Sequence, residues 1–232
     1  MRRISVLFFV VLFGGTALCM AQQQKTAQQQ NKWGVFGGYT IERVSGYPNL
    51  YSDADGDAFA PFNLRGGEGS LTYYFRKYIG VTADFSITSK GYATNTPTSF
   101  QKIREQHYLF GPEFRYTIKT ASGSRRVSLF AHQLFGVSHT TIDFEGFPSI
   151  ECYDNGQTTH ATCSANPFTM ASGGGMDIRL DSHVSIRPAQ LDYLTQQISA
   201  KSFLGTGLAS QTGSDKLGVS GLRYSVGVVV GF

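Results

Sequence analysis

The chain has 232 residues, 13% of them aromatic, and a formal net charge of +4 at pH 7. Two of its arginines and none of its acidic residues lie in a predicted N-terminal leader, so removal of the leader lowers the charge to +2. This surplus is too small to indicate a nucleic-acid partner. The mean hydropathy of −0.15 is ordinary for a soluble protein, but membrane-spanning strands alternate apolar and polar residues, which an average does not detect.

The N-terminus has the pattern of a cleaved signal peptide over residues 1–21. Arginines precede an apolar run over residues 4–18 that is too short to span a bilayer as a helix, and small residues favour cleavage after Ala21. The alternative, lipidation of Cys19, needs a small residue directly before the cysteine, where this chain has Leu18. We therefore expect an exported protein.

Residues 22–31 are polar and of low complexity, which predicts a disordered leader before one folded domain over 32–232. In that domain, eight segments alternate between apolar and polar or small residues. The segments lie at 33–43, 67–76, 79–88, 107–118, 127–138, 168–180, 184–196 and 222–232. Because successive side chains of a strand point to opposite faces, each segment predicts a β-strand with one apolar face. For 127–138, the pattern leaves the apolar side undecided.

The connections between these segments alternate in length. Those after the second, fourth and sixth segments are short. The long connections lie near 45–65, 89–106, 139–167 and 197–219. Outer-membrane barrels combine short periplasmic turns with longer extracellular loops. A soluble lipocalin-like barrel is the alternative, but the export signal and the aromatic C-terminus favour the membrane.

The last predicted strand ends the chain on an aromatic residue. Its apolar face consists of Tyr224, Val226, Val228, Val230 and Phe232. A soluble β-sandwich rarely ends on its final apolar residue, whereas outer-membrane barrels do. The segment resembles the terminal strand that the barrel assembly machinery recognises, so we expect that machinery as a partner.

Together these features resemble the small outer-membrane β-barrels, the family of the OmpA transmembrane domain and OmpX-like proteins. Residues 173–179, 184–188 and Asp192-Tyr193 are also similar to the last hairpins of such barrels. The resemblance implies an all-β fold, an eight-stranded antiparallel up-and-down transmembrane barrel without OmpA's periplasmic domain. It further implies a monomer in the outer membrane, in contact with lipids and lipopolysaccharide.

If the apolar faces contact lipid, the polar faces fill the lumen, where an unpaired charge is unfavourable by several kcal/mol. The predicted lumen charge network has nearly balanced signs and consists of Glu42, Glu68, Asp84, Glu113, Arg115, Asp177, Arg179, Arg187, Asp192 and Arg223. Asp192 joins it only if a bulge turns Gln190 and Asp192 inward. We expect that bulge near Pro188, because proline cannot donate to a strand ladder. An eight-stranded barrel is only just wide enough for side chains to fill it.

Cys152 and Cys163 remain after removal of the leader. An even number of thiols in an exported protein favours a disulfide between them. Two free thiols are one alternative. A metal site with His160 and Asp154 is another, but it has few convincing ligands.

Two motifs indicate other chemistry only weakly. His183-x-Ser185 resembles the His-x-Ser pair of the outer-membrane lipid A deacylase, but it is predicted at the periplasmic end, away from the outer leaflet. Residues 53–57 resemble the start of a calcium loop, but Ala58 and Leu64 occupy positions that need glycine and glutamate.

We therefore expect no catalytic site, no cofactor and no metal. The predicted role is structural, with surface contacts through the loops and a lumen plugged by salt bridges. A narrow porin-like channel for small solutes or apolar ligands is the alternative. An outer-membrane lipid-modifying enzyme is a more remote one.

Overall fold

The computed structural model describes residues 31–46, 61–91, 100–119, 126–145, 160–199 and 216–232. These residues form β1 (Trp33–Ser45), β2 (Phe62–Tyr74), β3 (Ile79–Gly91), β4 (Phe100–Lys119), β5 (Arg126–Glu145), β6 (His160–Ala165), β7 (Phe168–Arg179), β8 (Val184–Ser199) and β9 (Lys216–Gly231). No helix in this described part of the chain is long and apolar enough to cross a membrane.

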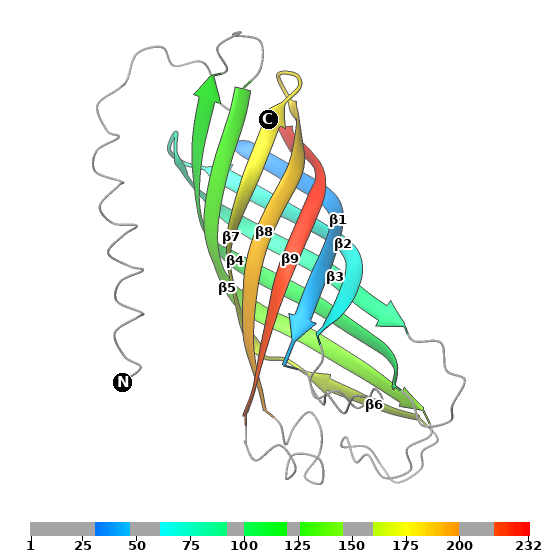
Figure 1. Ribbon diagram of the computed structural model, residues 1–232. Coiled ribbons are helices and arrows are strands. Elements are labelled where there is room, and N and C mark those ends of the chain that lie inside the picture. Colours follow the sequence, from blue (N-terminus) through cyan, green and yellow to red (C-terminus); the bar gives the residue numbers. More distant parts are fainter. Residues whose placement is uncertain (1–30, 47–60, 92–99, 120–125, 146–159, 200–215) are drawn as a thin grey trace. The chain divides into compact units, whose positions relative to one another are not determined.

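Eight of the described strands close an antiparallel barrel (Figure 1). Strands β1 to β5 pair in chain order, β7, β8 and β9 continue from β5, and β9 pairs back onto β1. The predicted eight-stranded antiparallel barrel is therefore confirmed.

The two ends of the barrel differ in their connections. Residues 75–78 join β2 to β3 and residues 180–183 join β7 to β8 at the end where the chain terminates, which we call the turn end (Figure 1). There, Gly231 N donates to His183 O (2.7 Å). The opposite end, which we call the loop end, carries the longer connections.

The first and last strands close against each other at the turn end. Trp33 N donates to Phe232 O (2.9 Å), and Phe232 N donates to Trp33 O (3.1 Å). From there the register runs without a shift to the pair Ser45 and Ser220. The ladder therefore has no open edge between β9 and β1, as the terminal position of Phe232 predicts.

Strands β6 and β7 follow one another along the barrel wall and are interrupted at Asn166 and Pro167. β6 pairs with Thr140–Glu145 of β5, and Ser138 N donates to Pro167 O (3.0 Å). Proline has no N–H group to continue the ladder. The prediction of a loop over 139–167 is thus wrong at both of its ends, where strands extend the wall.

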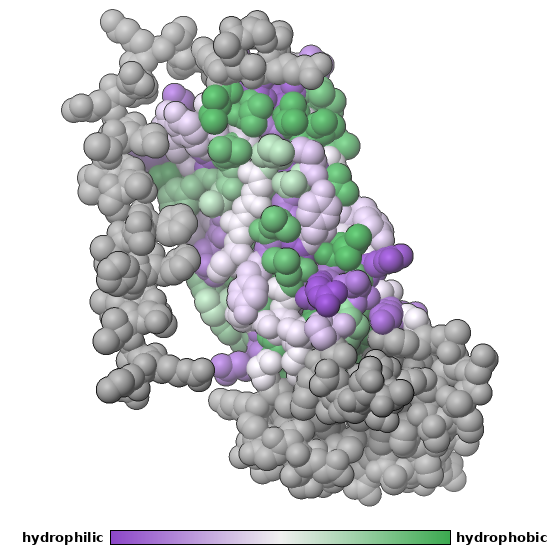
Figure 2. Space-filling model, viewed as in Figure 1, coloured by the Kyte–Doolittle hydropathy of each residue, from purple (hydrophilic) through white to green (hydrophobic). Residues whose placement is uncertain are grey.

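Large apolar side chains point outward on each of the eight barrel strands, which accounts for the many exposed aromatic and aliphatic residues. Figure 2 shows one side of the barrel, where apolar residues gather in a band near the turn end. Strand β5 carries such residues on both faces: Leu129, Phe135 and Val137 point outward, whereas Phe130 and Leu134 are buried. This is why its alternation could not indicate the apolar side.

The predicted bulge near Pro188 is present in β8. The register with β9 shifts between Arg187 and Gln190. Beyond the shift, Gln190 and Asp192 are buried, whereas Leu191 is 50% exposed. One extra residue in the strand thus moves Asp192 from the outer face into the lumen.

The lumen is not filled by polar side chains alone, in contrast to the prediction. Apolar side chains buried near the loop ends of their strands are Val44, Leu64, Ile103, Ile142, Ile198 and Val219. A further apolar cluster consists of Leu109, Leu134, Ala171 and Leu194. Where a strand is apolar on both faces, period-two alternation cannot reveal its inner side.

Candidate functional site in the barrel lumen

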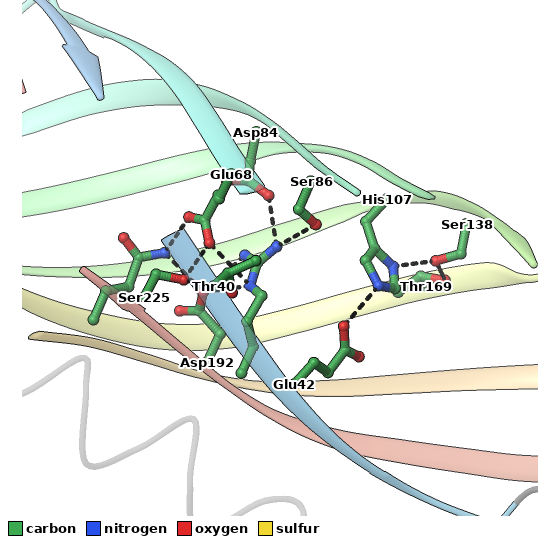
Figure 3. A network of polar contacts seen from close by, with 12 residues as sticks. Thr40, Glu42, Glu68, Asp84, Ser86, His107, Ser138, Thr169, Asp192 and Ser225 are labelled. Atoms are coloured by element: carbon green, nitrogen blue, oxygen red, sulfur yellow. Dashed lines mark hydrogen bonds and ion pairs between the residues drawn. The ribbon is translucent and has the colours of Figure 1, made fainter. Parts of the chain in front are cut away.

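A polar network around Arg223 crosses the lumen (Figure 3). The fully buried guanidinium donates to Asp84 Oδ1 (3.0 Å) and Ser86 Oγ (2.9 Å) of β3. It also donates twice to Asp192 Oδ2 of β8, at 2.7 Å and 3.1 Å. One arginine of β9 therefore ties two other strands together through charged hydrogen bonds, which are the stronger kind.

Glu68 joins this network from β2. Its carboxylate accepts from Gln190 Nε2 (2.8 Å) and from the Ser225 hydroxyl, and it lies 3.4 Å from Arg223 Nε. Gln190 Nε2 also donates to Asp192 Oδ2 (2.8 Å). We call this set the Arg223 network; its members are Glu68, Asp84, Ser86, Gln190, Asp192, Arg223 and Ser225.

The Arg223 network needs a glycine on the neighbouring strand. A Cβ atom at Gly173 of β7 would overlap Asp192 Oδ1 and the backbone of Leu191. The glycine-rich stretch that resembles the last hairpins of such barrels thus leaves room for the Asp192 carboxylate.

A second ion pair lies nearer the turn end. Arg187 Nε donates to Asp177 Oδ1 (2.7 Å) and Arg187 Nη2 to Asp177 Oδ2 (3.2 Å), which is a bidentate geometry. The guanidinium also lies 4.5 Å from the ring centroid of Phe36 and 4.0 Å from that of Phe130. Arg187 is therefore held by one carboxylate and two aromatic faces.

Glu113 is held mainly by hydroxyl groups. Its carboxylate accepts from the Tyr74 hydroxyl and from Thr82 Oγ1 (2.8 Å). The half-buried Arg115 lies over the Tyr74 ring, 3.5 Å from its centroid. Arg115 and Arg179 line a small pocket of about 30 Å³ at the turn end, so both lie toward that mouth and outside the Arg223 network.

A separate cluster surrounds His107 of β4 (Figure 3). His107 Nε2 lies 3.1 Å from Glu42 Oε2 and 3.4 Å from Glu105 Oε2. On the other side of the ring, His107 Nδ1 lies 2.6 Å from Ser138 Oγ, which is 2.6 Å from Thr169 Oγ1. We call these five fully buried residues the His107 cluster.

The sequence pattern does not indicate this cluster as a site. Glu42 was predicted to lie in the charge network with the arginines, and its main-chain partner in β9 is indeed Arg223, but its carboxylate contacts His107. Glu105 lies in a segment predicted as a loop, whereas β4 begins at Phe100. His107 opens the predicted strand 107–118 on the side opposite the apolar Tyr108 and Phe110, and this polar position was the available signal.

His132 is the second buried histidine that the prediction missed. Its Nε2 lies 2.8 Å from Asp192 Oδ1, and its Nδ1 lies 4.0 Å from Glu113 Oε2. It was missed because it belongs to the strand whose faces the alternation left undecided. It connects the Arg223 network to Glu113.

The predicted near balance of charge does not hold for the buried interior. Among the described residues, seven carboxylates are buried, together with the guanidinium groups of Arg187 and Arg223 and the imidazoles of His107 and His132. The seven are Glu42, Glu68, Asp84, Glu105, Glu113, Asp177 and Asp192. Arg115 and Arg179 are only half-buried, so the interior has an excess of acidic groups.

Other predicted sites lie elsewhere. His183 is exposed at the turn end, and its Nδ1 lies 2.8 Å from Ser182 Oγ. Ala21, Cys152 and residues 53–57 lie outside the described residues. Cys163 lies in β6, but its side chain is not described, so the disulfide stays a prediction.

A family model described as an outer membrane protein beta-barrel domain matches residues 11–232. Among solved structures, the chain is similar to Ail, the attachment invasion locus protein of Yersinia pestis, with 19% identity and a TM-score of 0.54 over 88% of this chain and 100% of that chain. Ail in complex with the heparin analogue sucrose octasulfate gives 20% identity and a TM-score of 0.51 over 88% and 100%. Neisserial surface protein A gives 15% identity and a TM-score of 0.47 over 87% and 97%. Curated protein sequences contain no significant match.

Proposed function

Because the chain belongs to the outer membrane protein β-barrel family, we propose that its barrel is a plugged scaffold that holds surface loops in the outer membrane. The turn end then faces the periplasm and the loop end faces the outside. The signal peptide is cleaved after Ala21 on export. The assembly machinery recognises the apolar face of β9 that ends at Phe232.

The outward side chains support direct contact with lipid. Aromatic residues cluster near the turn end, where the rings of Trp33 and Tyr73 lie 4.6 Å apart and those of Tyr78 and Tyr116 lie 6.3 Å apart. Such aromatic groups favour a membrane interface, because they present an apolar body and a polar tip. We therefore propose outer-membrane lipids and lipopolysaccharide as the partners of the barrel wall.

The observation that carries the plugged lumen is the burial of Arg223. Its guanidinium is 0% exposed and contacts Asp84, Ser86 and Asp192 from two other strands. Opening a pore along the axis would separate these partners and leave buried charges unpaired, which is costly in free energy. The network thus favours one closed arrangement of the lumen.

Conductance in planar bilayers tests this proposal. We expect the purified, heat-modifiable wild-type protein to give no single-channel steps. Arg223→Ala removes the central cation, and the outward-facing Arg43→Ala is the matched control on β1. Reproducible wild-type steps that are abolished by Arg223→Ala and retained by Arg43→Ala would establish a gated channel instead.

The channel remains the second candidate function because of one observation. The small pocket at the turn end is lined by Arg115 and Arg179, beside the Arg187–Asp177 pair, and its surplus of arginines would attract small anions to this mouth of the barrel. For transport, this pocket must connect to the loop end past the buried apolar side chains and the Arg223 network. The same conductance experiment decides between the two candidates.

The enzyme alternative is disfavoured, although Ser138, His107 and Glu42 follow one another as in a Ser–His–acid triad. A nucleophilic serine must donate its proton to the histidine and must be reachable by substrate. Ser138 is 0% exposed. Its hydroxyl is also engaged by Thr169. We propose that these residues have no catalytic role; unaltered lipid A in cells that express the protein is the expected result.

A further inference from the structure

We propose that the His107 cluster binds one divalent transition-metal ion inside the barrel, with Glu42, Glu105 and His107 as its protein ligands. The site lies in the lumen that the proposed function treats as closed. The inference does not depend on that function, because a conducting barrel could hold the same ion on its wall.

The three side chains offer a suitable donor set. One imidazole nitrogen and two carboxylate oxygens come together, all within 4.8 Å of one another. His107 Nε2 lies 3.1 Å from Glu42 Oε2 and 3.4 Å from Glu105 Oε2. Ligands of a tetrahedral zinc ion with bonds of about 2.0–2.1 Å are roughly 3.3 Å apart, so these distances fit two edges of such a site.

The hydrogen bonds behind the ring direct the Nε2 lone pair toward the carboxylates. The carbonyl of Pro167 can only accept, and Thr169 Oγ1 donates to it (3.3 Å). Thr169 Oγ1 can then accept from Ser138, which in turn accepts from His107 Nδ1–H. A neutral His107 in this arrangement has no proton on Nε2. This is the tautomer of a metal-ligating histidine, whose other nitrogen is oriented by a hydrogen-bond partner.

Two buried oxygen atoms beside the cluster are incompletely satisfied. Among the described residues, Glu42 Oε1 and Thr88 Oγ1 are buried without a partner at good hydrogen-bond geometry, and the Thr88 hydroxyl makes only a weaker contact with the Glu42 carboxyl. Thr88 is fully buried and is the cross-strand neighbour of Glu105. Buried polar atoms are nearly always satisfied, and an unsatisfied one indicates an unrecorded water or ion.

The charge of the interior also favours a bound cation. The buried carboxylates exceed the buried guanidinium groups by seven to two, and both arginines are engaged by carboxylates other than Glu42 and Glu105. A divalent ion between Glu42 and Glu105 would offset two of these buried negative charges.

Metal content after refolding tests the proposal. The full chain, without a polyhistidine tag, is unfolded in urea with chelator and refolded into detergent with or without Zn²⁺. Folded protein is identified by its heat-modifiable migration, and bound zinc is counted by mass spectrometry after dialysis against chelator. We expect about one zinc ion per folded barrel, and we expect it to resist chelator because the ligands are buried.

Matched variants locate the ion. His107→Gln and Glu105→Gln are each expected to retain at least about tenfold less zinc. His132→Gln, which removes the other buried histidine of the lumen, is expected to retain as much zinc as the wild type. Unfolding in urea gives a second readout: zinc should raise the midpoint of the wild type and of His132→Gln, but not that of either cluster variant.

Two results would overturn the proposal. One is a folded wild-type barrel that retains no zinc and whose midpoint does not respond to it. The other is equal retention by wild type and both cluster variants, which would place the ion elsewhere. Channel steps in bilayers would contradict the plugged lumen but would leave this test unaffected.

Discussion

The Arg223 network and the His107 cluster lie in the same lumen, but their buried carboxylates have different kinds of partner. In the network, one guanidinium donates to Asp84, Ser86 and Asp192, and an amide and a hydroxyl satisfy Glu68. In the cluster, two carboxylates share one imidazole nitrogen, and Glu42 Oε1 has no partner at good hydrogen-bond geometry among the described residues.

The two regions differ in how many hydrogen-bond donors their central cationic side chain can offer to buried carboxylates. A planar guanidinium has five donors and can satisfy carboxylates from several strands at once. An imidazole has at most two, so it cannot satisfy two carboxylates and a serine together. Protein groups alone complete the first region, whereas the second is the region in which we propose a bound ion.

The largest loss of stability is expected when Arg223 is replaced in the Arg223 network. Arg223→Met leaves the carboxylates of Glu68, Asp84 and Asp192 buried without their cation, which should lower the free energy of unfolding by about 3–5 kcal/mol. Urea unfolding of the protein in lipid vesicles measures this. Arg43→Met, an exposed arginine on β1, should change it by less than about 0.5 kcal/mol. Equal effects of the two substitutions would show that Arg223 is not the centre of the network.

Two hydroxyl groups on β3 allow the two regions to be compared by single substitutions. Ser86 accepts from Arg223 (2.9 Å), whereas Thr88, two residues along β3, is buried with an unsatisfied Oγ1. Ser86→Ala should therefore destabilise the barrel by about 1–2 kcal/mol. Thr88→Val keeps the shape and removes only this hydroxyl, so in metal-free protein it should be neutral within about 0.5 kcal/mol. If Thr88→Val were the more harmful change in metal-free protein, the Thr88 hydroxyl would already be satisfied by protein groups.

The fold was predictable because its signals can be read directly along the chain: the alternation of apolar and polar residues, the alternating lengths of the connections, and the ending at Phe232. Membership in the charge network depended on which side chains point inward. That could be predicted for Asp84 and Arg223, whose strands alternate cleanly, and for Asp192 once Pro188 indicated a bulge. All three are buried in the structure, where Arg223 contacts Asp84 and Asp192.

The partner of each charge could not be predicted, since it depends on strand tilt and side-chain direction across the lumen. Glu42 is the register partner of Arg223, yet it contacts His107 of β4 instead. His132 and the inward apolar residues of β5 were missed because this strand carries large apolar residues on both faces. Glu105 was missed because β4 extends into a segment that has no clear alternation.

The central claim is that Arg223 and its carboxylates act as one unit that fixes the lumen. A double-mutant cycle on Arg223 and Asp192, with Met and Leu as the replacements and urea unfolding in vesicles as the measurement, tests it most directly. We expect the double variant to be more stable than the sum of the single losses by at least about 2 kcal/mol, because removal of both partners leaves fewer unpaired charges. Losses that simply add would contradict the claim.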